Sequence, residues 1–245
     1  MKPEDFFNRQ YVEHKLKTDY TSFKWLRKVF KKYDIHREDV AISLLDKGDT
    51  LLDIGCGEGS LLLKATNKYL NLYGVDIVPH RIEVARNNFT KEKIENQVIL
   101  KVGDINKGLD FEDNFFDAVT IIATLGLILN PFYTIQEIHR VLKKEGILIV
   151  QVANIAYIKR RIQLFLGKLP INTSPDNWNN WKEIGWDRGV LHCFTLTPLR
   201  WLLESQDFKI EKVTGSGLFA MLRCWWPSLL SGDICIKARK INEKT

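Results

Sequence analysis

Short apolar runs alternate with amphipathic segments along most of the chain. The runs that predict strands lie at residues 50–54, 70–75, 97–102, 116–122 and 146–152. Apolar positions at helical spacing predict helices between them, at residues 60–69, 79–88 and 133–142. Because strands and helices alternate, the pattern predicts an α/β domain with a mostly parallel sheet and helices on both faces. The strands lack polar alternation, which indicates burial on both sides.

Two segments, residues 1–47 and 155–195, depart from this alternation of strands and helices. Residues 1–47 carry apolar side chains at helical spacing among lysines, which predicts an N-terminal helical cap before a main domain at 48–245. Residues 155–195 interrupt the main domain with an irregular, tryptophan-rich stretch, which predicts an aromatic lid. The αβ rhythm then resumes with a helix that ends at Glu204 and with strands at 209–213 and 234–238.

The composition sets limits on the class of protein. The chain has 245 residues, of which 45% are hydrophobic and 27% charged, and this balance excludes disorder, collagen and coiled coil as the main architecture. Four cysteines without a C-x-x-C pair, and an N-terminus without a signal-peptide profile, predict a cytoplasmic protein with no metal centre. The longest nearly apolar run, at 118–129, is shorter than the ~20 residues that span a bilayer, so we expect a soluble chain.

The net charge of +6 is distributed unevenly. Residues 1–47 carry +3, residues 48–154 carry −3 and residues 155–245 carry +6. An excess this small does not indicate a nucleic-acid partner. Because the positive charge belongs to the predicted cap and to the part that contains the lid, it favours an anionic small molecule as the partner of those regions.

A glycine-rich loop follows the first strand of the main domain and opens a helix. Gly55, Gly57 and Gly59 allow a tight turn and a close approach of the backbone to a ligand. A dinucleotide fingerprint would need a glycine where Ser60 stands, and a P-loop would need a lysine after its last glycine. Asp53 just before the loop would repel a pyrophosphate. The loop is therefore typical of a site for a ligand with a positive charge.

The pattern Asp53-x-Gly55-x-Gly57-x-Gly59 resembles motif I of class I S-adenosylmethionine (SAM) dependent methyltransferases. Two later acidic residues agree with the family, since Asp76 ends the second strand and Asp104 follows the third. The resemblance implies a Rossmann-like class I methyltransferase fold with a seven-stranded sheet, SAM as cofactor and S-adenosylhomocysteine as product. It also implies a set of cofactor-binding residues: Asp53, Gly55, Cys56, Gly57, Gly59, Asp76, Ile77, Asp104, Ile105 and Ala123.

Within that set the family assigns distinct parts of the cofactor to distinct residues. Asp53, Gly55 and Gly57 would hold the methionine end, and the Asp76 carboxylate would accept both ribose hydroxyls. Asp104 would take the exocyclic amine of adenine, with Ile77 or Ile105 covering the ring.

A narrower resemblance, to the MetW-like or type 11 branch of these enzymes, covers about residues 50–213. It rests on Thr124-Leu125, Asn130-Pro131, Val152-Ala153-Asn154, Gly167-Lys168-Leu169-Pro170 and Leu191-His192-Cys193-Phe194-Thr195. One departure is Leu129, since many relatives carry a histidine just before the Asn-Pro pair. The N-terminal extension is also longer than usual for this branch.

The acceptor site is predicted from the cap and the lid. His192 follows the aromatic stretch, and we expect it either to act as a general base or to hydrogen-bond the lid backbone. The other candidates for contact with the acceptor are Tyr11, Asn154, Trp178, Trp181 and Trp186. The tryptophans would either line a hydrophobic pocket or staple an irregular lid, and the segment around Tyr11 would either cover the cofactor or form a surface helix.

Residues 155–167 predict a basic amphipathic helix. Ile155, Ile158, Ile162 and Phe165 share one face, and a basic cluster lies beside them at 159–161. Helices of this kind either lie on an anionic membrane or pack on their own domain, and the sequence leaves both open.

Three functions remain open at this stage. The first is a SAM-dependent methyltransferase that acts on oxygen or nitrogen of a small, anionic acceptor. The second is a non-catalytic MetW-like partner of an acyltransferase in methionine biosynthesis, and the third is a membrane-surface enzyme for lipid or glycan precursors. Nucleic-acid methylation is disfavoured, because the chain has neither an Asn-Pro-Pro-aromatic tetrapeptide nor a Pro-Cys pair.

Overall fold

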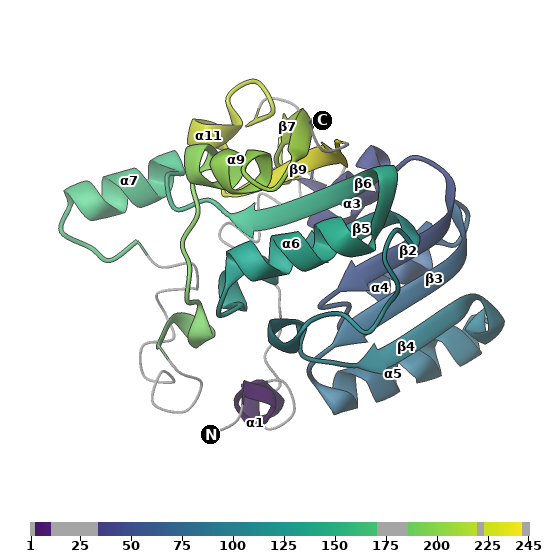
Figure 1. Cartoon of the computed structure of the whole chain (residues 1–245). Helices are drawn as coiled ribbons and strands as arrows, with labels where there is room; N and C mark the ends of the chain where they lie inside the picture. Colours follow the sequence, from purple (N-terminus) through teal and green to yellow (C-terminus); the bar gives the residue numbers. More distant parts are fainter. Residues whose placement is uncertain (1–2, 11–33, 171–185, 220–222, 242–245) are drawn as a thin grey trace.

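The computed structural model describes residues 3–10, 34–170, 186–219 and 223–241. Its centre is a seven-stranded sheet with the order β4-β3-β2-β5-β6-β9-β7 (Figure 1). The strands, taken in sheet order, are Val98–Val102, Tyr69–Asp76, Gly48–Ile54, Phe116–Ile122, Leu142–Ala153, Asp233–Lys240 and Phe208–Thr214. Neighbours from β4 to β6 pair in parallel, and β9 pairs antiparallel with both β6 and β7. The predicted α/β fold with a mostly parallel sheet is confirmed.

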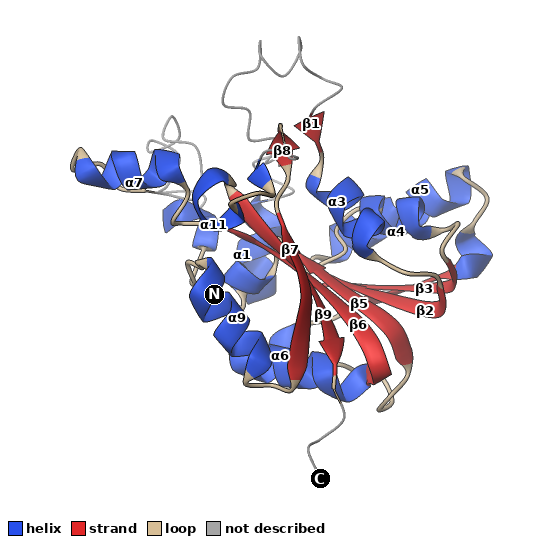
Figure 2. Cartoon of the chain, turned by 90° about the horizontal axis from the view of Figure 1, so that it is seen from above, coloured by secondary structure: helices blue, strands red, loops and turns tan. Residues whose placement is uncertain are grey.

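Helices cover both faces of this sheet (Figure 2). One core cluster joins the sheet to α6 (Pro131–Val141) and α9 (Leu196–Glu204). A second cluster, on the other face, joins it to α3 (Arg37–Leu44), α4 (Ser60–Ala65) and α5 (Pro79–Lys91). The smaller elements are α1 Pro3–Asn8, β1 Asp34–Ile35, η3 Glu95–Gln97, η4 Ile105–Lys107, η5 Leu125–Leu127, α7 Ile158–Phe165, η7 Trp186–Gly189, β8 Gly217–Leu218 and α11 Pro227–Leu230.

The predicted all-helical cap is wrong at one point. Asp34–Ile35 forms the short strand β1, which pairs antiparallel with β8 of the C-terminal part. The helix that follows, α3, buries Val40 and Leu44 in the second core cluster. The end of the predicted cap therefore packs within the helical layer of the sheet, while the boundary at residue 47 stays a prediction.

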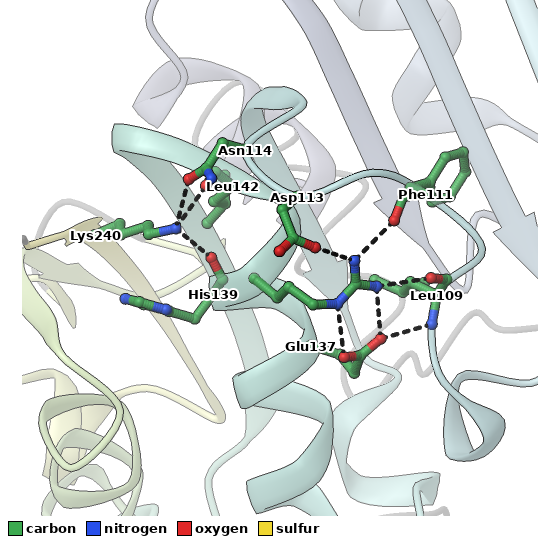
Figure 3. A network of polar contacts seen from close by, with 9 residues as sticks. Leu109, Phe111, Asp113, Asn114, Glu137, His139, Leu142 and Lys240 are labelled. Atoms are coloured by element: carbon green, nitrogen blue, oxygen red, sulfur yellow. Dashed lines mark hydrogen bonds and ion pairs between the residues drawn. The ribbon is translucent and has the colours of Figure 1, made fainter.

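The end of α6 also differs from the expected one. Asn130 caps the helix, with its side chain accepting from the Tyr133 N–H at 3.1 Å, and Pro131 occupies the first turn. We predicted that the helix would run to Leu142, but this residue pairs with Phe116 and begins β6. The Lys240 ammonium of β9 donates to the His139 carbonyl of α6 at 2.7 Å and to the Leu142 carbonyl at 2.8 Å, so the sheet holds the end of α6 (Figure 3).

A polar network fixes the segment after η4 against α6 (Figure 3). The Arg140 guanidinium makes two bonds of 2.9 Å to the Glu137 carboxylate. It also donates to the carbonyls of Leu109 and Phe111, each at 2.8 Å. These bonds from Arg140 hold the pKa of Glu137 below its usual range. The segment therefore forms a rigid wall beside the ends of β3 and β4.

Candidate functional site

The glycine loop lies where β2 ends, at the edge formed by the carboxyl ends of the parallel strands. The N–H groups of Gly55 and Cys56 both donate to the Val75 carbonyl of β3, at 2.7 and 3.1 Å. Gly55, Gly57 and Gly59 have φ of 74°, 54° and 80°, in the left-handed region that side chains disfavour. Gly59 also starts α4 as its N-cap. Ligands of open parallel sheets bind at this edge.

Asp76 joins the glycine loop to the next strand and helix. One carboxylate oxygen accepts from the Gly57 N–H at 2.8 Å, and the other accepts from the Val78 N–H at 2.9 Å. The side chain is 5% exposed. A carboxylate oxygen accepts about two hydrogen bonds, so each oxygen retains capacity for a ligand hydroxyl.

Arg81, in the first turn of α5, belongs to the same cluster, and the sequence did not reveal it. One guanidinium nitrogen lies 3.9 Å from the Asp76 carboxylate. A Cβ atom added to Gly57 would collide with this guanidinium. No spacing rule links Arg81 to the loop, because the contact depends on the angle at which α5 leaves β3.

Asp53 is buried beneath the loop. Its strand pairs with β5 so that it faces Thr120, whose hydroxyl donates to its carboxylate at 2.6 Å. Burial raises the pKa of Asp53 to about 7, although the bond from Thr120 opposes the shift. A cationic ligand beside the carboxylate would favour its charged form.

This raised pKa predicts a pH dependence of ligand binding. We expect the affinity for SAM, which is cationic, to rise about tenfold between pH 6 and pH 8 as Asp53 ionises. Titration calorimetry at both pH values measures this change, and Asp53→Asn is the matched control that removes the ionisation. The same pH profile in wild type and Asp53→Asn would contradict the assignment.

A rise in pH changes folding stability in the opposite direction to the affinity for the ligand. The folded-state pKa is raised, so the stabilising contribution of neutral Asp53 is fully present below its ordinary value and is lost as pH rises toward about 7. Asp53→Asn should therefore gain stability relative to wild type over this range, as thermal unfolding at several pH values can show.

Asp104 borders a cavity of about 560 Å³ at the ends of β3 and β4. Its carboxylate accepts from the backbone and side-chain nitrogens of Asn106, at 3.0 and 2.8 Å. Ile77 lines the cavity, whereas Ile105 is buried in the first core cluster. That either isoleucine covers an adenine ring stays a prediction. Lys107, Tyr133, Glu137 and Arg140 also line the cavity, and the sequence did not single them out.

Cys56 does not offer its side chain to this site. The thiol is buried in the second core cluster, and burial raises its pKa well above the ordinary value. A Cβ atom on Gly74 would lie 2.8 Å from the sulfur, so the side chain points into the packed interior. The predicted cofactor contact of Cys56 stays a prediction.

The loop after β5 lies at the same edge of the sheet as the glycine loop. Ala123 has a φ of 56°, a strained value for a residue with a side chain, and its N–H donates to the Gln151 carbonyl at 2.9 Å. The carbonyl of Gly126 accepts from the N–H groups of Leu191 and His192, at 2.8 and 3.1 Å. This loop thus anchors the segment by which the predicted lid returns to the domain.

His192 lies against the same loop, as its position after the lid suggested. Its Nε2 atom is 3.3 Å from the Leu129 carbonyl. The ring therefore stands beside the position where many members of the resembled family carry a histidine. The contact is compatible with both expected roles, a base near the acceptor or an anchor of the lid backbone.

Asn154, a predicted contact of the acceptor, makes structural hydrogen bonds around α11. It is fully buried, and its amide nitrogen lies 3.0 and 2.9 Å from the carbonyls of Ser228 and Ser231 around α11. Its side-chain oxygen accepts from the Ala156 N–H at 3.0 Å. These bonds fix the buried side chain around α11, and the predicted contact with the acceptor stays a prediction.

Tyr11, Trp178 and Trp181 lie outside the described residues, so their predicted contacts stay predictions. The backbone of Trp186 begins η7. At the end of this turn, a Cβ atom on Gly189 would collide with the ring of Phe6. The N-terminal helix α1 therefore packs on the lid segment, although the two are far apart in the sequence.

The fold and this edge define a Rossmann-like α/β domain with acidic residues around a glycine loop. A family model described as a methyltransferase domain matches residues 45–186, more than half of the chain. The chain belongs to this methyltransferase family. The narrower MetW-like resemblance stays a prediction.

Curated relatives agree with the family. A demethylmenaquinone methyltransferase of Symbiobacterium thermophilum is 34% identical over 114 residues, which are 45% of each chain. A sterol 4-C-methyltransferase of Caenorhabditis elegans is 36% identical over 99 residues, covering 40% of this chain and 29% of that protein. The chain thus matches less than half the length of these relatives.

Solved structures agree with the fold. A SAM-dependent methyltransferase from Mesorhizobium loti has a TM-score of 0.62 at 16% identity, covering 83% of this chain and 97% of that one. Another from Aquifex aeolicus has a TM-score of 0.59 at 15% identity, covering 91% and 100%.

Proposed function

We propose that this protein is a SAM-dependent methyltransferase that acts on a small-molecule acceptor. The observation that carries the proposal is Asp76, a buried carboxylate that binds the glycine loop through Gly57 and the start of α5 through Val78. Family membership supports it, since a methyltransferase domain requires a methyl donor.

The residues at the edge of the sheet suit the parts of SAM. Asp53 and the backbone of Gly55 and Gly57 would hold the methionine end, where the ionised carboxylate favours a cationic group. Asp76 would accept the ribose hydroxyls, and Asp104 with Ile77 would border adenine in the cavity. When bound, SAM supplies an electrophilic methyl group. The chain's own contribution is to orient the two reactants and to exclude water, and good alignment contributes about 7–11 kcal/mol.

The acceptor is proposed from the relatives and from charge. One further relative is a 27-O-demethylrifamycin SV methyltransferase of Amycolatopsis mediterranei, and the Caenorhabditis elegans relative is a sterol 4-C-methyltransferase, so the names of the relatives include both an oxygen and a carbon acceptor. Our sequence-based expectation of oxygen or nitrogen therefore widens to include carbon. The basic excess of residues 155–245 favours an acceptor with a carboxylate or phosphate group.

Calorimetry followed by a turnover assay tests the function. We expect one site for SAM or S-adenosylhomocysteine, and transfer of labelled methyl groups from SAM into a pool of quinols, phenols and organic acids. Absence of binding to both compounds would refute the proposal. Binding without transfer, together with co-purification of an acyltransferase, would instead support the non-catalytic alternative.

His192→Ala should lower turnover about 10²-fold or more while changing the affinity for SAM little, if the imidazole takes a proton from the acceptor. Steady-state kinetics and calorimetry measure the two effects. His192→Gln separates the roles, because glutamine can still hydrogen-bond the Leu129 carbonyl but cannot act as a base. His36→Ala, at the half-exposed N-cap of α3, is the control. Full turnover in His192→Gln would assign the residue to anchoring alone.

A further inference from the structure

Helix α7 carries an apolar face that is turned toward solvent. The helix extends away from the sheet beyond the end of β6 (Figure 1). Ile158, Ile162 and Phe165 share one face because they are four and three residues apart. Ile162 is 52% exposed and Phe165 is 89% exposed. None of the residues of α7 is buried, and the adjoining Leu166 and Leu169 are exposed as well. We name these five residues the α7 face.

Two arginines hold the first turn of this helix, Arg160 on the side opposite the α7 face and Arg161 at the border of that face. Arg160, which lies away from the α7 face, donates to the Asn154 carbonyl at 2.5 Å. Arg161 donates to the Ala156 carbonyl at 2.6 Å. Asn154 is itself bound to the carbonyls around α11. The N-terminal end of α7 is therefore fixed, and the apolar face is presented outward.

The charged residues of α7 and of the segments adjoining it in the sequence all have one sign. Residues 155–170 contain four basic residues and no acidic residue. Lys159 and Arg161 are exposed and flank the face on its two sides, and Lys168 follows the helix. An apolar stripe between basic residues is complementary to a surface with an apolar interior and anionic headgroups.

A second exposed group lies beside the base of α7. Trp225, which is 85% exposed, and Trp226 precede α11, which lies next to α7 in both overall views (Figures 1 and 2). The segment that carries the two tryptophans contacts the start of α7. The Arg223 guanidinium carbon lies 5.9 Å from the ring centroid of Tyr157, which is the N-cap of α7. Tryptophan favours the boundary between water and lipid, because its apolar ring contacts lipid there while its N–H group hydrogen-bonds to water.

We propose that the α7 face and the adjacent tryptophan pair Trp225–Trp226 dock the protein onto an anionic lipid surface. No helix among the described residues is long and apolar enough to cross a membrane, so docking would be peripheral. Helix α7 follows the carboxyl end of β6, at the same edge of the sheet as the glycine loop. Docking would therefore bring this edge toward the membrane, whatever acceptor it serves.

Vesicle sedimentation of the full chain tests the proposal. The probes are vesicles of equal parts phosphatidylglycerol and phosphatidylcholine, and vesicles of phosphatidylcholine alone. We expect binding to the anionic vesicles, weaker binding to the neutral ones, and release at about 0.5 M NaCl. Phe165→Asp should weaken binding about tenfold or more, and Lys159→Gln with Arg161→Gln should weaken it about fivefold for each charge removed.

Leu70→Asp is the matched control, because it places the same charge at another exposed leucine, 67% exposed, on β3. It should leave vesicle binding unchanged. Thermal unfolding of each variant checks that the fold is retained. Absence of vesicle binding, or equal binding by wild type and Phe165→Asp, would overturn the proposal. A dimer in solution that Phe165→Asp dissociates, without any binding to vesicles, would assign the face to a second copy of the chain and overturn it too.

Discussion

Replacing Asp76 with asparagine should lower the affinity for SAM about 100-fold or more. The carboxylate accepts from the Gly57 and Val78 N–H groups at 2.8 and 2.9 Å. An asparagine side chain has one oxygen, so its amide group would face one of these two donors. The variant would lose an acceptor for ribose and disturb the loop that binds the methionine end. Hydrogen bonds to charged groups contribute about 1.5–3 kcal/mol each, and two of them account for the expected factor. Calorimetry with SAM and S-adenosylhomocysteine measures it.

Asp117 provides the matched control for this prediction. Its carboxylate accepts from the N–H groups of Asp49 and Thr50 at 2.9 and 2.8 Å, so it has the same structural role at the beginning of β5. This is the opposite edge of the sheet from the glycine loop. Asp117→Asn should therefore lower the free energy of unfolding and leave the affinity for SAM unchanged. An equal loss of affinity in both variants would show that Asp76 acts only through stability.

Replacing Gly55 with alanine should lower the free energy of unfolding by about 2–5 kcal/mol and abolish measurable SAM binding. Two effects combine at this position. A φ of 74° is strained for alanine, at a cost of about 1–3 kcal/mol, and overpacking adds a similar amount. The added Cβ atom would collide with the Thr124 side chain of the loop after β5. Denaturant unfolding and calorimetry measure the two outcomes.

Gly167 isolates the backbone effect. It has a φ of 69°, but a Cβ atom there would meet nothing within 4 Å. Gly167→Ala should therefore cost about 1–3 kcal/mol from φ alone and leave SAM binding intact. Adding Thr124→Ala to Gly55→Ala removes the two closest atoms and should recover part of the stability. A loss in Gly55→Ala no larger than in Gly167→Ala would show that the loops do not pack as the structure indicates.

The contacts of the glycine loop show how the candidate site is preorganised. The glycine loop donates to the Val75 carbonyl and, through the Gly57 N–H, to the Asp76 carboxylate, and it packs on Thr124 of the neighbouring loop. The first two contacts come from the end of β3, and the third comes from the loop after β5. The loop therefore holds its conformation before a ligand arrives, which reduces the ordering cost of binding.

Much of the fold was predictable because the strands are buried on both faces. Such strands are continuous apolar runs, and β5 was predicted with its observed bounds, Phe116–Ile122. The errors occur where long-range pairing overrides local pattern. Asp34–Ile35 lies next to amphipathic sequence but is a strand because β8 pairs with it, and Leu142 leaves its helix because Phe116 pairs with it.

For the candidate site, residues near one another in the chain were easier to predict than those that meet only after folding. The glycine loop and the acidic strand ends have fixed spacing, so Asp53, Asp76 and Asp104 stand at the same edge of the sheet, as expected. Arg81 carries no such signal, and nothing in the sequence placed Thr124 against Gly55. Conversely, Cys56 and Asn154 were predicted from their positions in the sequence. The side chain of Cys56 points into the packed interior, and the side chain of Asn154 is hydrogen-bonded to carbonyls around α11.

The sequence by itself determined the class of protein: an α/β domain whose glycine loop and acidic strand ends resemble those of methyltransferases. These features are local, because a strand, a turn and a helix N-terminus are each specified by residues close together in the chain. Only the tertiary structure decided which side chains reach the site and which faces remain exposed. Burial raises the pKa of Asp53, and packing turns Ile105 inward and leaves Phe165 in solvent. Each of these outcomes depends on neighbours that lie far away in the sequence, so no local pattern contains it.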